Sequence, residues 1–215
     1  MNTEVSSNEI FTKSKSTLVR SLNLDIALST CGWSITDLKA NPPKDKYVLV
    51  SVARWGNIKP IAIANKVSNN TLCERYTKRI ISLDILRSEV AKLIDIFQPD
   101  FIVTEDTFMG SFPSAYAALE QAITSVALMC YDNYRMPLYR IPTKNAKQAV
   151  TNSGASKKAS VLEHIVSSDT IVFKQKALTC DLDHHSADSI AVGYDFLTRV
   201  YPDLCRTLTG ESLCN

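Results

Sequence analysis

The chain has 215 residues, of which 45% are hydrophobic, and its formal net charge is only +2. This length suggests one domain with a sizeable core, and the near-neutral charge excludes a protein that is basic all over, so any nucleic-acid-binding surface must be local. Six scattered cysteines without a C-x-x-C pair indicate reduced intracellular thiols, and the lack of a long apolar stretch or of a secretory h-region predicts no membrane contact.

The N-terminal part of the chain is predicted to form a tail followed by strands. Residues 1–18 are rich in Ser, Thr, Asn and Lys and are expected to be a mobile tail. Apolar and Val-rich runs predict three strands, at residues 19–29, from residues 32–35 onward, and at residues 47–53. The stretch 54–70 is ambiguous, because residues 58–64 fit a further strand.

From residue 71 onward, helical and strand patterns alternate. Apolar residues at helical spacing predict helices at residues 71–97, 113–134, 143–150, 157–166 and 184–200. Short apolar runs predict two further strands at residues 101–104 and 138–141, the first of them apolar on both faces as in a parallel sheet. The order predicts an α/β fold, with a mixed five-stranded sheet and helices on both faces. It forms one domain over residues 19–200, followed by a tail over residues 201–215.

Acidic side chains occur where this core should be apolar. Asp25 lies inside the first strand, and Glu105 ends the strand that begins at Phe101. A buried carboxylate is costly unless it is paired or holds a metal. Because open sheets place ligands at strand ends, pairing of these two strands would bring Asp25 and Glu105 together. His185 and Asp188 share one face of the last helix and are expected to lie over them.

Packed carboxylates repel one another, and divalent cations relieve that repulsion. Oxygen ligands with at most one imidazole suit Mg²⁺ or Mn²⁺, and two such ions about 3.5–4 Å apart are the usual machinery for phosphodiester hydrolysis. Other interpretations stay open. Each acid alone also fits an edge, a loop or a helix N-cap. A zinc site is a further alternative, although a second C-x-x-C half is missing; its ligands would be Cys180, Asp183, His184 and His185.

Two further features lie close in sequence to these acids. Four lysines surround a Gly turn and form either a solvated helix face or, beside an acidic metal site, a phosphate clamp; they are Lys144, Lys147, Lys157 and Lys158. Phe108 follows Glu105 and is either a satellite core residue or an aromatic that stacks on an unpaired base.

Over residues 20–198 the chain resembles the RuvC family of Holliday junction resolvases, which has a ribonuclease H-like fold. The most specific piece is FQPDFIVTEDTFM. Three other stretches are also similar to family segments: LNLDIALSTCGWSI, IPTKNAKQAVTNSGASKKASV and HHSADSIAVGYDFL. The chain departs from the family at Ile26-Ala27, where Pro-Gly is usual, and residues 37–70 are longer than usual.

The resemblance implies roles for individual residues. The metal site of the family falls on Asp25, Glu105, His185 and Asp188. Phe108 matches an aromatic that is pushed against bases at the junction centre. Lys147 and Lys158 match basic residues that act near the scissile phosphate and along the DNA backbone. His184 stays an alternative to His185, because it lies four residues before Asp188 and can face the same way.

The implied activity is metal-dependent resolution of four-way DNA junctions, with two Mg²⁺ ions per site and Mn²⁺ as a substitute. Two symmetric scissile sites call for a homodimer, and the helix at 113–134, which is apolar nearly all round, is either its interface or a buried monomer helix. Two alternatives are another ribonuclease H-like nuclease, acting on branched DNA or RNA–DNA hybrids, and a non-catalytic DNA-binding module. The expected location is the cytoplasm of a bacterial or phage-infected cell, with an organellar or viral source left open.

Overall fold

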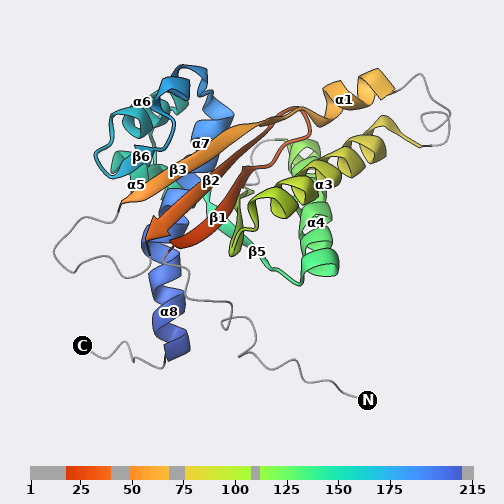
Figure 1. Ribbon diagram of the computed structural model, residues 1–215. Helices are drawn as coiled ribbons and strands as arrows, with labels where there is room; N and C mark the ends of the chain where they lie inside the picture. The colour runs from red at the N-terminus through yellow and green to blue at the C-terminus, as the bar shows by residue number, and fades with distance from the viewer. Residues whose placement is uncertain (1–17, 40–48, 68–75, 108–111, 210–215) are drawn as a thin grey trace, which may run out of the picture.

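The structure, a computed structural model, describes residues 18–39, 49–67, 76–107 and 112–209 (Figure 1). A six-stranded sheet crosses the molecule in the order β5-β4-β1-β2-β3-β6. Its strands are β1 (Leu18–Asp25), β2 (Cys31–Lys39), β3 (Val50–Ile58), β4 (Phe101–Asp106), β5 (Leu138–Pro142) and β6 (Ile171–Phe173). The pairs β1–β2 and β2–β3 are antiparallel and the other three pairs are parallel, so the predicted mixed sheet is confirmed.

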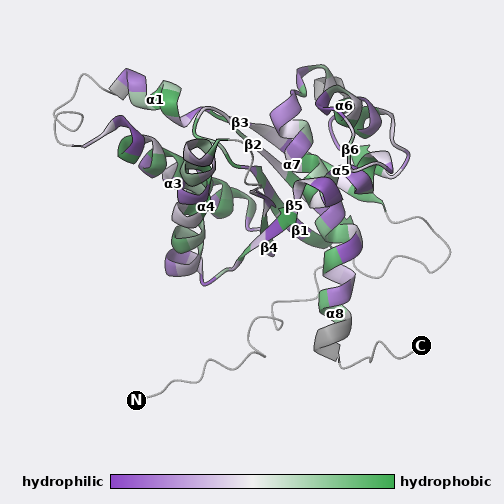
Figure 2. Ribbon diagram, turned by 180° about the vertical axis from the view of Figure 1, so that it is seen from behind, coloured by the Kyte–Doolittle hydropathy of each residue, from purple (hydrophilic) through white to green (hydrophobic). Residues whose placement is uncertain are grey.

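Helices cover both faces of this sheet, as predicted. The longer ones are α3 (Lys78–Phe97), α4 (Pro113–Tyr134) and α7 (His184–Asp195), and the shorter ones are α1 (Pro60–Val67), α5 (Thr143–Thr151), α6 (Lys158–Ser167) and α8 (Tyr201–Thr209). A 3₁₀ helix η1 (Lys176–Asp181) precedes α7, and a wider turn η2 (Phe196–Val200) joins α7 to α8. In Figure 1, α3 and α4 lie on one side of the sheet and α5, α6 and α7 on the other. Figure 2 shows hydrophilic and hydrophobic residues mixed along these helices, as expected for helices with one face in solvent.

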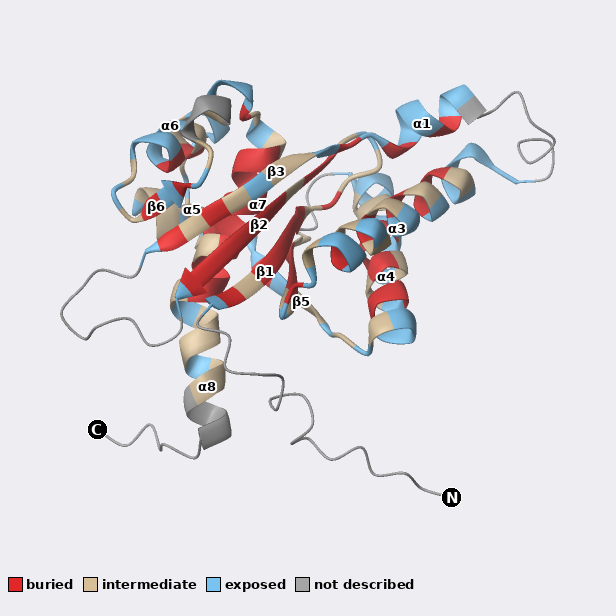
Figure 3. Ribbon diagram, in the orientation of Figure 1, coloured by how far each residue is buried: buried red, intermediate tan, exposed pale blue. Residues whose placement is uncertain are grey.

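The sheet separates two hydrophobic cores. On one face, Leu22 and Ile102 pack with residues of α3 and α4 such as Leu86 and Val126. On the other face, strand residues pack with α6 and α7, among them the fully buried Ile190. Figure 3 shows β1 and β2 buried along most of their length. The central strands are therefore buried on both faces; one face is apolar, and the other carries polar residues of β1 and β2 that bond to one another, such as Ser21 and Thr36.

The structure differs from the sequence prediction in several elements. The predicted five-stranded sheet lacked β6, whose three residues are too short to show any alternation. Residues 58–64 do not form a strand: β3 runs to Ile58, and α1 begins at Pro60, because proline is favoured in the first turn of a helix. The helix expected from residue 71 begins at Lys78, where the Thr77 side chain accepts a hydrogen bond from the Ile80 amide.

The third strand, the last helix and the two predicted tails also differ from the structure in their bounds. The third strand, expected at residues 47–53, is observed at Val50–Ile58. The last helix, expected at residues 184–200, ends as α7 at Asp195 and continues through η2 into α8. The first nine residues of the segment expected as a C-terminal tail are thus helical. The N-terminal tail lies outside the described residues except for Leu18, which begins β1.

Candidate functional site

The two parallel strands β1 and β4 place the first two predicted acids at neighbouring strand ends. Leu24 of β1 pairs with Thr104 of β4, and the Thr104 hydroxyl donates to the Leu24 carbonyl over 3.2 Å. Asp25 and Glu105 are the next residues of each strand. The carboxyl ends of adjacent parallel strands are where open sheets bind ligands, and the predicted meeting of the two acids is observed.

Helix α7 delivers the other two residues because β2 lets it approach closely. Asp25 pairs with Gly32, and a Cβ atom at Gly32 would lie 2.2 Å from the carbonyl oxygen of His185. Only glycine leaves room for the start of α7 there. The helix begins at Asp183, whose carboxylate accepts a hydrogen bond from the Ser186 amide over 2.8 Å.

His185 lies against Asp25, with 2.8 Å between Nδ1 and Oδ2. This contact agrees with the expectation that the last helix brings His185 over the acids at the strand ends. The Asp25 side chain is only 13% exposed, so the imidazole is a principal partner of this carboxylate. His184, the alternative, is exposed at the start of the helix.

Lys158, at the start of α6, occupies the centre of the acidic cluster. Its ammonium lies 2.9 Å from Oδ2 of Asp188, whose side chain is 9% exposed. The pKa of Lys158 is raised: burial lowers it, but Asp188, Asp25 and Glu105 together outweigh burial. A lysine predicted to contact DNA phosphate therefore pairs with a carboxylate of the cluster, Asp188, in the DNA-free protein.

The carboxylates themselves have altered acidity. Burial raises the pKa of Glu105 to about 7; a hydrogen bond from Thr143 opposes this shift, and the charges of Asp25 and Asp188 add to it. Burial also raises the pKa of Asp25, against the hydrogen bond with His185, and the charge of Asp188 contributes in the same direction. The cluster thus lacks enough positive charge to keep all of its acids ionised near neutral pH.

This shortage of positive charge fits a divalent cation. The donor set of three carboxylates and one imidazole matches the ligands that Mg²⁺ and Mn²⁺ accept. Among the described residues, no three His, Cys, Asp or Glu side chains are already gathered as a metal-binding group. Asp188 is paired with Lys158, and Asp25 contacts His185. The same finding gives no support to the zinc alternative.

Asp106, which follows Glu105 directly, belongs to a different cluster. Its Oδ1 lies 2.6 Å from Nη2 of Arg140 on β5. Arg140 also donates to Thr107 over 2.9 Å and pairs with Glu120 of α4 at 2.5 Å, while the Thr107 hydroxyl donates to Glu120. Glu105 thus faces the other residues of the candidate metal site. Asp106 instead pairs with Arg140 and accepts a hydrogen bond from the Thr107 amide. Sequence reasoning missed Arg140, although a charged residue within a five-residue strand indicates that a partner of opposite charge lies nearby.

For the other predicted DNA-binding residues, the structure shows how far three of the lysines are buried. Lys144 and Lys157 are exposed and Lys147 is half-buried. A Cβ atom at Gly154 would lie 2.4 Å from Cγ of Lys144, so the Gly turn packs directly on this lysine. Phe108 lies outside the described residues. In the described part of the chain, no helix is long and apolar enough to cross a membrane.

Comparison with known proteins identifies a family. A family model described as crossover junction endodeoxyribonuclease RuvC matches residues 56–195. A relative with the same description, from Yersinia enterocolitica, is 33% identical over 86 residues, which are 40% of this chain and 49% of that protein. This chain thus spans about half the length of the curated relatives that it matches.

Solved structures of two proteins have the same fold. That of Thermus thermophilus RuvC has a TM-score of 0.60 at 12% identity, over 86% of this chain and 97% of that chain. The same protein has also been solved in complex with Holliday junction substrate, at a TM-score of 0.58. The yeast mitochondrial Holliday junction resolvase Ydc2 has a TM-score of 0.55 at 14% identity, over 94% and 91% of the two chains.

Proposed function

Because the chain belongs to the RuvC family, we propose that it is a structure-specific endodeoxyribonuclease that resolves four-way DNA junctions by metal-dependent hydrolysis. One observation carries the proposal. The Lys158 ammonium lies 2.9 Å from Asp188 of α7, and the charges of Asp25 and Glu105, which end β1 and β4, also raise the pKa of Lys158. Such a cluster is built to hold cations at a strand end, which is what phosphodiester chemistry needs.

The acids would hold two divalent cations, Mg²⁺ or Mn²⁺, which when bound would activate water and neutralise the leaving oxygen. Asp25 lies between the other groups and is the residue that would serve both ions. The hydrogen bond from Thr143 orients Glu105. His185 orients Asp25 through Nδ1, and its neutral ring can also ligate a cation or accept a proton.

Lysines would bind the DNA backbone. Lys158 is 55% exposed although it contacts Asp188, so its ammonium can move to an incoming phosphate. Lys144, Lys147 and Lys157 lie on α5 and at the start of α6 and would extend the phosphate contacts. We also propose that Phe108 stacks on bases at the junction centre. Phe108→Ala should then slow cleavage of intact junctions more than of pre-opened ones.

Helix α4 is the proposed homodimer interface. Its inner face is buried against the sheet, whereas Leu128 and Tyr131 are 57% and 60% exposed. Two symmetric cleavage sites on a four-way junction match a two-fold dimer. The substrate also suggests the compartment, which we propose to be the cytoplasm of a bacterial or phage-infected cell.

The deciding experiment compares synthetic four-way junctions with flaps, RNA–DNA hybrids and linear duplexes. We expect paired nicks in the junction with Mg²⁺, none with EDTA, and none with Asp25→Asn. Preferential cleavage of hybrids or flaps would instead identify another ribonuclease H-like nuclease. Junction binding without any metal-dependent cleavage would identify a DNA-binding module.

A further inference from the structure

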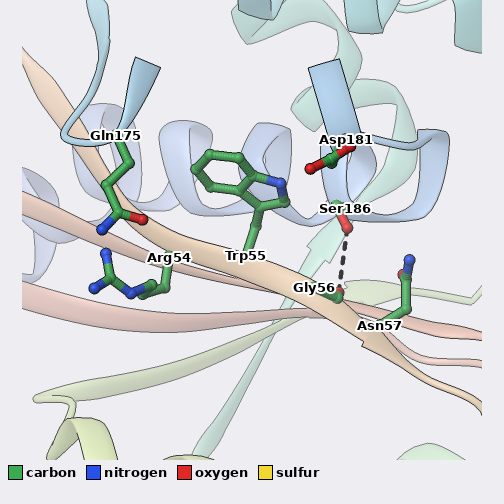
Figure 4. Close-up of a pocket in the computed structure, with 7 residues that line it drawn as sticks. All are labelled: Arg54, Trp55, Gly56, Asn57, Gln175, Asp181 and Ser186. Atoms are coloured by element: carbon green, nitrogen blue, oxygen red, sulfur yellow. Dashed lines mark hydrogen bonds between the residues drawn. The ribbon is translucent and has the colours of Figure 1, made fainter. Parts of the chain in front are cut away.

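A hollow lies near the proposed metal-site residues, on the outer edge of β3. It has a volume of about 240 Å³ and lies between β3, η1 and the start of α7 (Figure 4). Strand β6 pairs with β3 only as far as Val52 and Phe173, so in the described structure the rest of this edge has no neighbouring strand. The hollow is smaller than the about 300–1,000 Å³ of sites for drug-sized molecules. This size suits a single planar ring system.

The lining of the hollow combines a fixed aromatic ring with polar groups. Trp55 is half-buried and packs edge-on against buried Phe173, with 5.4 Å between ring centroids and 82° between planes. Figure 4 shows its indole between Gln175 and Asp181, with Arg54 on the Gln175 side. Among the described residues, no hydrogen bond engages the side chain of Gln175 or Asp181, or the indole N–H. A rigid stacking surface is thus flanked by groups that can still bond to a ligand.

The hollow is close to the metal-site residues. Ser186 lines it and donates to the Gly56 carbonyl over 3.2 Å, and the preceding residue is His185, which contacts Asp25. Across the sheet, Asp25 pairs with Gly32, which pairs with Asn57 at the rim of the hollow. Strands lie about 4.8 Å apart, so the hollow begins roughly 10 Å from Asp25. A stacked strand advances about 3.4 Å per nucleotide, which places the hollow about three nucleotides from a phosphate at the metal site.

We propose that this hollow, here called the Trp55 pocket (Arg54, Trp55, Gly56, Asn57, Gln175, Asp181 and Ser186), binds one unpaired base of the DNA strand that is cleaved. The inference rests on the proposed function and adds a specificity site to it. Any base can stack on the indole, and Arg54 supports stacking or the adjacent phosphate. Asp181 is an acceptor for the amino group that cytosine, adenine and guanine carry and thymine lacks. The Trp55 pocket therefore makes the enzyme disfavour thymine about three nucleotides from the cut.

Fluorescence tests occupancy directly, because the chain has only two tryptophans. Trp33→Phe leaves Trp55 as the single reporter. In EDTA, where no cleavage occurs, saturating junction DNA should quench its emission. A second measurement replaces single nucleotides around the cleaved bond by abasic ones. One position should lose about tenfold in affinity with the wild-type protein, as for one stacked base.

Variants connect that position to the Trp55 pocket. Trp55→Ala should bind intact and abasic junctions equally, and Trp55→Phe should restore part of the difference. Asp181→Asn should keep the quenching but lose the discrimination against thymine, while Asp84→Asn, an exposed acid on α3, should change neither. Junction binding without quenching, or an abasic profile unaltered by Trp55→Ala, overturns the Trp55 pocket and leaves the proposed function standing. A wild-type chain that binds no DNA overturns both.

Discussion

Glu105→Gln is expected to stabilise the metal-free protein at alkaline pH. The substitution removes the charge, keeps the size, and still lets Thr143 donate a hydrogen bond. In the wild type, folding raises the pKa of Glu105 from 4.5 to about 7. The folded state then binds the proton more tightly, so stability from this group is present below pH 4.5 and is lost as pH rises through 7. The full loss corresponds to about 3 kcal/mol, and because the side chain is not fully buried we expect about 2 kcal/mol.

Urea unfolding in EDTA at pH 5 and pH 8 measures this effect. At pH 8, Glu105→Gln should be more stable than wild type and melt roughly 4–8 °C higher, and at pH 5 the two should be nearly equal. Added Mg²⁺ should then stabilise the wild type more than the variant, since the metal-binding carboxylate is gone. Glu163→Gln, an exposed acid on α6, is the control. A variant that gains no stability between pH 5 and pH 8 relative to wild type would refute the assignment of Glu105 as a desolvated acid.

The other predictions concern the groups around Glu105. Asp25→Asn and Asp188→Asn should each abolish cleavage and leave junction binding in EDTA intact, because we propose both acids as cation ligands; parallel loss of binding in a gel-shift assay would contradict this. Lys158→Met should tighten Mn²⁺ binding to the DNA-free protein about tenfold in calorimetry, since it frees Asp188; it should also reduce the slope of log junction affinity against log salt by about 1. Unchanged metal affinity would show that the ammonium does not compete. His185→Ala should lose most activity and His185→Asp should keep much of it with a flatter acid limb, because aspartate stays ionised well below neutral pH. Near-normal activity of His185→Ala with an inactive His184→Ala would reverse the choice of histidine.

The carboxylates of the site could be predicted because a charged side chain is unexpected in a buried segment. Asp25 and Glu105 end strands that are buried on both faces, and the apolar residues of these strands predicted that the two strands lie in one sheet. The position of Asp188 followed from helical spacing. Such residues are visible in sequence because burial makes them costly there.

Individual contacts between residues far apart in the sequence could not be predicted. Lys158 lies 30 residues before Asp188 in a Lys-rich stretch that fits a solvated helix face, so nothing local showed that its ammonium enters the acidic cluster. The contact of His185 with Asp25 depends on how closely α7 approaches Gly32, which is a packing outcome. The short β6 carried no periodic signal, and without it the edge of β3 and the position of Trp55 could not be located.

Because α7 must pack on Gly32 to complete the site, the site can form during synthesis only after α7 has been made. Asp25 and Glu105 leave the ribosome well before Asp188, which follows Glu105 by 83 residues. At about 5–20 residues per second, this interval lasts roughly 4–17 s. Throughout it, the nascent chain holds two of its acids without the helix that supplies the third and the histidine. The proposed DNA cleavage would thereby be withheld from unfinished chains, and a chain truncated before α7 would be inert.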